Sequence, residues 1–154
     1  MTTETKKILL VEDDIDCRNI LAVIINHLGY RVVQAASGRN SLKKAKYERP
    51  DLIVVSLDYP YFNGIKVISR FKNHSATSSL PILVYPPWES ESTTELALSA
   101  GATEVMTEPF SVNAMRAALH RHAPLDAEIF GIDDVEIAPP VVLLPSEVFS
   151  ELER

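Results

Sequence analysis

Short apolar runs alternate with longer amphipathic segments along the first 123 residues. The runs are rich in β-branched residues and are bounded by charged or turn-forming residues, a pattern typical of strands buried in a parallel sheet. The predicted strands are 8–11, 31–35, 52–57, 82–85 and 104–106. The predicted helices are 15–28, 37–49, 65–73, 92–101 and 111–122.

The ends of these segments carry helix-capping residues. Asp14 and Ser111 are predicted N-caps, while Gly29 and Gly101 are predicted helix stops. Strict alternation of strand and helix predicts an α/β fold, a doubly wound five-stranded parallel sheet with helices on both faces. Such sheets bind ligands at the carboxyl ends of their strands. The residues that follow each strand are therefore the candidates for a functional site.

Charge is distributed unevenly between the body of the chain and its last part. The 154 residues carry a net charge of −6. Residues 1–123 hold 14 basic and 13 acidic side chains, a net of +1, whereas residues 124–154 hold 1 and 8, a net of −7. This shift predicts a domain at 1–123 and an acidic, proline-containing extension at 124–154. It also argues against nucleic acid as a partner, because phosphate backbones attract basic segments.

Two further features bear on the expected location. No apolar run approaches the roughly 20 residues that cross a bilayer, and the first residues are polar. We therefore expect a cytoplasmic protein with no membrane partner. The single cysteine, Cys17, excludes an internal disulfide.

The residues at the strand ends, taken in order, resemble a known family. The motifs are Glu12-Asp13-Asp14 after the first strand, Arg49-Pro50-Asp51 before the third, Pro60 and Gly64 after it, and Thr107-Glu108-Pro109-Phe110 after the fifth. From about Lys6 to Ala123 the chain is similar to the CheY-like receiver domain of bacterial two-component response regulators. This resemblance implies a (βα)5 flavodoxin-like fold and a role in phosphorelay signal transduction.

The chemistry of that family needs five groups. Two carboxylates after the first strand hold Mg²⁺, and an aspartate at the end of the third strand accepts the phosphoryl group. A Ser or Thr after the fourth strand and a Lys after the fifth contact that group. In this sequence Glu12 and Asp13 match the acidic pair. The acceptor, hydroxyl and lysine positions are occupied by Ser56, Pro86 and Glu108.

These replacements predict a degenerate pseudo-receiver. Without the acceptor carboxylate we expect no phosphorylation and no enzymatic activity, and instead a protein-interaction module of a signalling pathway. Two alternatives stay open. Asp58, two residues past Ser56, could accept the phosphoryl group in its place. The second alternative is a cation or small-ligand sensor. It would use four carboxylates that could lie close together, those of Glu12, Asp13, Asp58 and Glu108, because crowded carboxylates bind cations such as Mg²⁺ or Ca²⁺.

The resemblance also indicates where a partner would bind. Receiver domains pair through their last two helices and the strand between them, so the predicted interaction surface includes Trp88, Val105 and Phe110, with a homodimer as one candidate. Val105 stands where the family has a movable aromatic ring, so the usual conformational switch is expected to be absent.

Two charged or apolar segments remain outside the site. The basic helix at 37–49 is expected to be a solvated face, or a surface on which the acidic extension docks. In the extension, the apolar residues 141–144 and Phe149 favour packing back on the domain over docking to a partner, since they would otherwise be exposed.

Overall fold

The computed structural model describes residues 5–36, 38–56, 64–85, 91–106 and 111–125. Strands and helices alternate within these residues as the sequence predicts. The strands are β1 (Lys7–Val11), β2 (Arg31–Ala35), β3 (Leu52–Ser56), β4 (Ile82–Tyr85) and β5 (Glu104–Val105). The helices are α1 (Ile15–His27), α2 (Gly38–Glu48), α3 (Gly64–Asn73), α4 (Glu91–Ala100) and α5 (Val112–His122).

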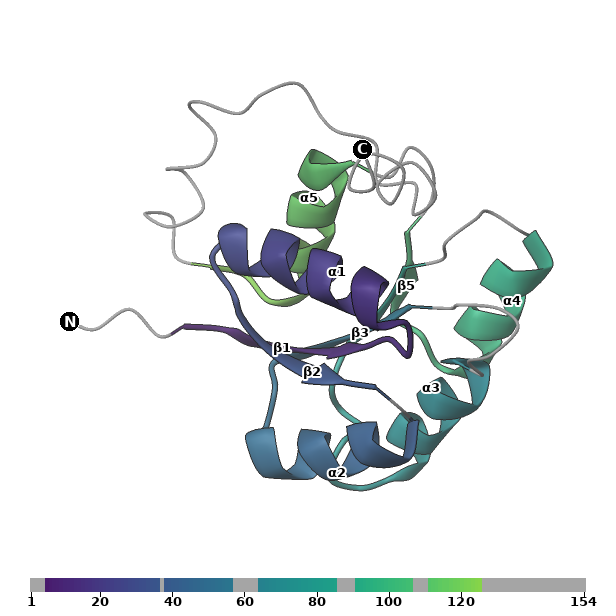
Figure 1. The fold of residues 1–154 in the computed structure, drawn as a ribbon. Coiled ribbons are helices and arrows are strands. Elements are labelled where there is room, and N and C mark those ends of the chain that lie inside the picture. The colour runs from purple at the N-terminus through teal and green to yellow at the C-terminus, as the bar shows by residue number, and fades with distance from the viewer. Residues whose placement is uncertain (1–4, 37, 57–63, 86–90, 107–110, 126–154) are drawn as a thin grey trace.

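The five strands form one parallel sheet in the order β2-β1-β3-β4-β5, which confirms the predicted fold class. Helices α1 and α5 cover one face, and α2, α3 and α4 cover the other (Figure 1). Because β1 lies next to β3, the winding of the chain reverses between them. In doubly wound sheets this reversal opens a crevice at the carboxyl ends of the two strands.

The core consists of two apolar layers, one on each face of the sheet. Ile8 and Leu10 of β1 pack in the layer under α1 and α5, whereas Leu9 and Val11 pack in the layer under α2, α3 and α4. This alternation follows from the two-residue repeat of a strand. It accounts for the uninterrupted apolar sequence of the central strands, which are covered on both sides.

Several helix ends are fixed by the residues that the sequence singles out. The Asp14 carboxylate accepts a hydrogen bond from the Cys17 amide at 2.9 Å, which confirms this N-cap. The Ser111 hydroxyl accepts one from the Ala114 amide at 3.0 Å. Gly101 ends α4 with a φ of +119°, and a Cβ there would lie 2.5 Å from Lys72 Cγ, so both the backbone and the space require glycine.

Within the described ranges, no helix has the length and apolar character needed to span a membrane. The predicted extension is described only as far as Leu125.

Candidate functional site

The candidate site lies at the carboxyl ends of β1, β3 and β4. Glu12 follows β1, and its backbone is held from two sides. Its amide donates to the Ala35 carbonyl at 3.1 Å, and its carbonyl accepts from Arg18 Nη1 at 3.0 Å. Arg18 Nε in turn donates to Gln34 Oε1 at 3.2 Å. The guanidinium therefore ties the first turns of α1 to the end of β2 and sets the position of Glu12 between them.

The side chains of Glu12, Ser56 and Tyr85 lie on the same face of the sheet. Glu12 continues the alternation of Ile8 and Leu10, while Ser56 and Tyr85 are register partners at the ends of β3 and β4. Glu12 is only 1% exposed and Ser56 only 2%. The Ser56 hydroxyl donates to Glu12 Oε1 at 3.3 Å. A buried carboxylate is thus paired with a neutral hydroxyl at the end of the third strand.

Tyr85, at the end of β4, lies beside Glu12 and Ser56. We call the region around Glu12, Asp13 and Ser56 the acidic corner. Its side chain is buried, and burial is the main reason why its pKa lies far above the ordinary value of tyrosine. Cys17, in the first turn of α1, and the carboxylate of Glu12 raise the pKa of Tyr85 further. At neutral pH the phenol is uncharged, so it adds no negative charge to the acidic residues beside it.

Asp13 is the second carboxylate of the corner and is partly exposed. Its Oδ1 atom is inaccessible to solvent and accepts no hydrogen bond from the described residues. A buried oxygen without a donor is unfavourable unless a water or a cation reaches it. Asp13 and Glu12 are oxygen donors of the type that Mg²⁺ and Ca²⁺ prefer. The described residues contain no group of three side chains able to hold a metal ion.

Several predicted site residues cannot be placed relative to this corner. Asp58, Pro86, Trp88, Glu108 and Phe110 lie outside the described residues. The structure therefore brings together Glu12, Asp13 and Ser56. The other predicted members of the pocket remain predictions.

Val105 lies in the described part, but not on a surface. It is 8% exposed and belongs to the apolar cluster that includes Val84 and Ala97. The expectation that Val105 contributes to an interaction surface is corrected accordingly, because α4 covers this face of β5. The exposed apolar side chains of this region are Leu96 and Leu98 on α4, at 57% and 47%.

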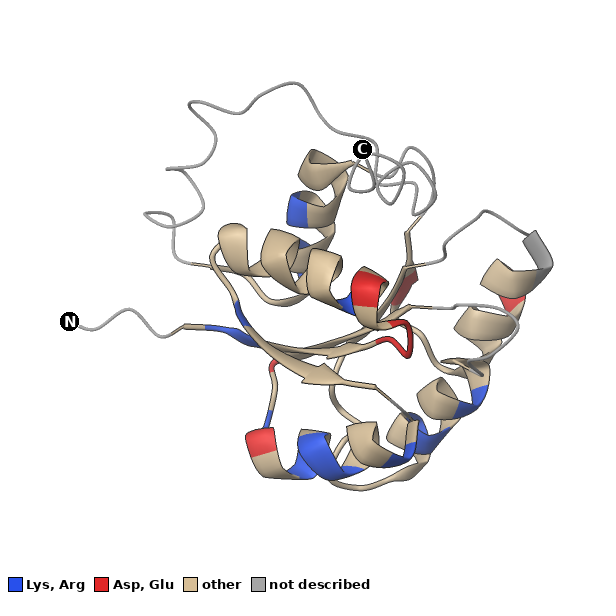
Figure 2. Cartoon of the chain, viewed as in Figure 1, with Lys and Arg blue, Asp and Glu red and all other residues tan. Residues whose placement is uncertain are grey.

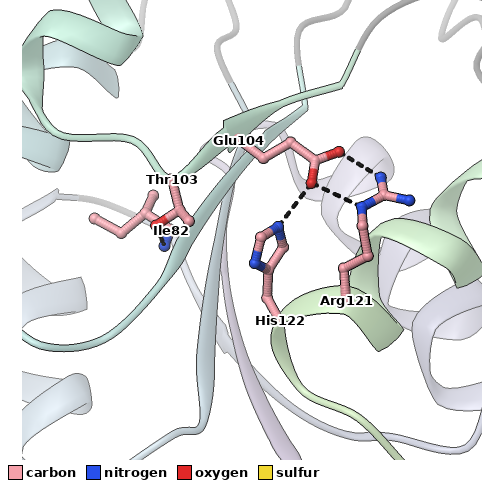
Figure 3. Close-up of polar contacts among 5 residues, drawn as sticks. All are labelled: Ile82, Thr103, Glu104, Arg121 and His122. Atoms are coloured by element: carbon pink, nitrogen blue, oxygen red, sulfur yellow. Dashed lines mark hydrogen bonds and ion pairs between the residues drawn. The ribbon is translucent and has the colours of Figure 1, made fainter.

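A polar network between β5 and α5 was not expected from the sequence (Figure 3). Arg121 donates to both carboxylate oxygens of Glu104, at 3.1 and 2.5 Å, and His122 Nε2 lies 2.7 Å from Glu104 Oε1. The hydrogen bond from Arg121 is the main cause that lowers the pKa of Glu104; partial burial opposes it and His122 adds to it. The network links the β5 edge of the sheet to the end of α5, and no spacing in the sequence signals it.

Comparison with known proteins gives a consistent result. The family model of the response regulator receiver domain matches residues 8–120. The alkaline phosphatase synthesis transcriptional regulatory protein PhoP of Bacillus subtilis is 33% identical over 141 residues, which are 90% of this chain and 58% of that protein. The sporulation initiation phosphotransferase F of B. subtilis is 28% identical over 120 residues, or 78% of this chain and 95% of that protein.

Solved structures agree with the sequence matches. Chemotaxis protein CheY4 of Vibrio cholerae superposes with a TM-score of 0.70 at 28% identity, covering 77% of this chain and 99% of that one. A response regulator from Chloroflexus aurantiacus gives a TM-score of 0.70 at 25% identity, covering 77% and 97%. The chain spans only 58% and 60% of the lengths of the PhoP regulator and of the transcriptional regulatory protein CrdR of Helicobacter pylori.

Proposed function

Because the chain belongs to the response regulator receiver domain family, we propose that it serves two-component signalling as a protein-interaction module that takes no phosphoryl group at the end of β3. One observation carries this proposal. The last residue of β3 is Ser56, and its buried hydroxyl is hydrogen-bonded to Glu12. Receiver chemistry requires a carboxylate at this place. The module therefore acts by binding a partner, without an enzymatic step of its own.

Electrostatics disfavours phosphorylation of Ser56 itself. A phosphoserine carries about −1.5 to −2 charges at neutral pH. Two unit charges about 4 Å apart repel by roughly 4 kcal/mol at an effective dielectric of 20. The Glu12 carboxylate lies 3.3 Å from the Ser56 hydroxyl, and the lysine that would offset such a charge is replaced by Glu108 in the sequence. Pro86, at the hydroxyl position, offers no side-chain donor.

The test is incubation of the full chain with Mg²⁺ and acetyl phosphate, followed by intact mass measurement. The expected result is no covalent phosphoryl adduct, while a receiver domain with an intact acceptor aspartate is modified in parallel. An adduct that is lost in alkali and abolished by Asp58→Asn would overturn the proposal in favour of a relay that uses Asp58. Ser56→Ala is the matched control, because it removes the hydroxyl and leaves Asp58 in place.

A second candidate function is cation sensing by the acidic corner. The observation that favours it is the buried Oδ1 atom of Asp13, which lacks a donor among the described residues. Glu12 and Asp13 would hold the ion, and its charge would offset their mutual repulsion. Calorimetric titration with millimolar Mg²⁺ or Ca²⁺ tests this, with Asp13→Asn as the comparison. Absence of heat in both proteins excludes it.

The partner is proposed to be a protein that contacts α4 and α5. Leu96 and Leu98 are both exposed on α4 and, being two positions apart on the helix, offer apolar side chains on two different sides of it. A second copy of the chain is one candidate for this partner. Sedimentation of Leu96→Ser/Leu98→Ser tests it against the α1 control Ile15→Ser/Val23→Ser, which removes two apolar side chains elsewhere that are at least as exposed.

A further inference from the structure

One surface of the domain carries most of its positive charge. Eight of the 14 basic residues in 1–123 lie between positions 39 and 72. Figure 2 shows them along α2 and α3, on the side of the sheet opposite α1 and α5. We define the basic face by its exposed members, which are Arg39, Lys43, Lys44, Lys46, Arg49, Lys66 and Arg70.

The two helices form one continuous face. A Cβ atom on Gly38, at the start of α2, would lie 2.6 Å from Val67 Cγ2 of α3, so the helices are in close contact there. Charges on both helices therefore act on the same ligand, within the roughly 10 Å over which salt at 0.1 M screens them.

Two acidic residues close to this face, Glu48 and Asp51, are bonded to Lys7 and not to the basic face. Glu48 pairs with Lys7 Nζ at 3.1 Å, and the Asp51 carboxylate accepts from the Lys7 amide at 2.8 Å. Within the described ranges, Arg39, Lys43, Lys46 and Arg49 make no ion pair. Among the described residues, no ion pair therefore neutralises the positive charge of these four side chains.

Basic residues at the end of α2 also line a groove. Lys43, Lys46, Tyr47 and Arg49 line a groove of about 550 Å³. The Tyr47 side chain is 84% exposed, which is unusual for an aromatic ring. A groove with an aromatic ring among three cations suits a segment that combines carboxylates with apolar side chains.

The chain contains such a segment immediately after the described domain. Residues 126–136 include five acidic side chains, no basic one, and the apolar residues Phe130 and Ile132. By contrast, residues 146–154 hold three acids and one arginine. The first acidic cluster, here called the acidic segment (126–136), has the higher density of negative charge.

The acidic segment starts within reach of the groove. The Ala123 carbonyl accepts a hydrogen bond from Tyr30, which directly precedes β2, and Leu125 packs in the same apolar cluster as Tyr30. Arg49 precedes β3, so the exit of the chain and the end of α2 lie on the amino-terminal edge of the sheet. Eleven residues span up to about 36–40 Å when extended, which exceeds the roughly 10 Å spacing of packed layers several-fold.

We propose that the acidic segment docks on the basic face, with its carboxylates on Lys43, Lys46 and Arg49. A short tether gives an effective concentration in the millimolar range, so even an affinity of about 1 mM keeps the segment docked about half of the time. This inference is independent of the phosphorylation chemistry of the pocket. It implies that the basic face is open to another polyanion or acidic partner only when the segment is displaced.

The test uses the full chain with a paramagnetic label on Gly131→Cys in a Cys17→Ser background. Amide signals of residues 43–49 are expected to be attenuated at low salt and recovered in about 1 M NaCl, where the Debye length falls to about 3 Å. Neutralising the segment with Asp133→Asn/Asp134→Asn/Glu136→Gln is expected to abolish the attenuation. The matched control, Glu147→Gln/Glu151→Gln/Glu153→Gln, removes the same charge and is expected to retain it.

Three outcomes would overturn the proposal. The first is attenuation confined to α1 and α5, which would place the segment on the opposite face. The second is attenuation of residues 43–49 that persists in high salt, which would mean that apolar contacts and not charges hold the segment. The third is attenuation seen only between labelled and isotope-enriched chains in a mixed sample, which would assign the basic face to a second copy. Lys43→Gln/Lys46→Gln must also weaken the effect, because these side chains line the groove.

Discussion

Restoring an acidic side chain at the end of β3 is expected to destabilise this domain. In the native protein the Ser56 hydroxyl lies 3.3 Å from Glu12 Oε1, and both side chains are almost fully buried. Ser56→Asp replaces the donor with a second carboxylate and turns an attractive contact into a repulsive one.

The size of the effect follows from that distance. Two carboxylates about 4 Å apart repel by roughly 1 kcal/mol in water and roughly 4 kcal/mol at an effective dielectric of 20. Because the site is buried, we expect a loss of about 2–4 kcal/mol at neutral pH, a large share of the 5–15 kcal/mol typical of a domain. At about 1.36 kcal/mol per pKa unit, this corresponds to a rise of up to about 3 units in the pKa of the introduced carboxyl group.

The sign of the pH dependence is fixed by the direction of that shift. The pKa of the introduced group is raised in the folded state above its unfolded value of about 3.9. Between the two values the folded protein binds more protons than the unfolded one, so stability falls as pH rises. The destabilisation should be smallest near pH 4 and should reach its full size by about pH 7.

Urea unfolding of Ser56→Asp and Ser56→Asn at several pH values measures this difference. The asparagine variant matches the aspartate in size without its charge, so the gap between the two isolates the electrostatic part. Mg²⁺ should reduce the difference in stability between the two variants at pH 7, because a ligand that binds the folded state stabilises that state by RT ln(1 + [L]/Kd). Equal stability of the two variants at pH 7 without Mg²⁺ would refute the reasoning, because it would mean that the corner already offsets a second charge.

Three further predictions concern the rest of the domain. Tyr30→Phe removes the 2.9 Å hydrogen bond to the Ala123 carbonyl and should lower the free energy of unfolding by about 1 kcal/mol in urea titrations. Glu104→Gln should cost about 1 kcal/mol at pH 7 and progressively less as pH falls through the lowered folded-state pKa of Glu104, because the stabilising contribution of its contact with Arg121 is lost there. Burial raises the pKa of Tyr30 and Tyr85, so above about pH 10 only the phenols of the unfolded chain ionise and the free energy of unfolding should fall. Thermal melts at alkaline pH measure this fall, which Tyr85→Phe should make smaller.

The fold was predictable because its signals are local. Strands buried on both faces read as continuous apolar runs, and Asp14 and Ser111 cap their helices as their side chains predict. The meeting of Glu12 and Ser56 was predictable too, since parallel strands align their carboxyl ends at one edge of the sheet. These inferences need only the period of each element and the order of the strands.

The contacts that were missed depend on how elements pack. Glu104 and Arg121 are 17 positions apart, and they meet only because α5 lies beside β5 at a particular angle. Arg18 reaches the carbonyl of Glu12 across the start of α1, a contact that no residue pattern signals. Val105 was expected at a surface because the family resemblance implied a partner site on the last two helices and the strand between them, yet α4 buries it. Side-chain reach and helix placement decide such contacts, and neither is encoded in hydrophobic periodicity.

Ser56 is uncharged, and this determines how the buried carboxylate of Glu12 is stabilised. A buried carboxylate is tolerated when it receives hydrogen bonds, and Glu12 receives one from Ser56. With a carboxylate at that position, repulsion from Glu12 would lower the stability of the domain, and a bound cation would offset part of that loss, as the Ser56→Asp variant is designed to reveal. A serine avoids this repulsion and provides no carboxylate to accept a phosphoryl group. Under the proposed function, this one residue would account both for the absence of phosphorylation and for a weaker dependence of stability on a divalent cation.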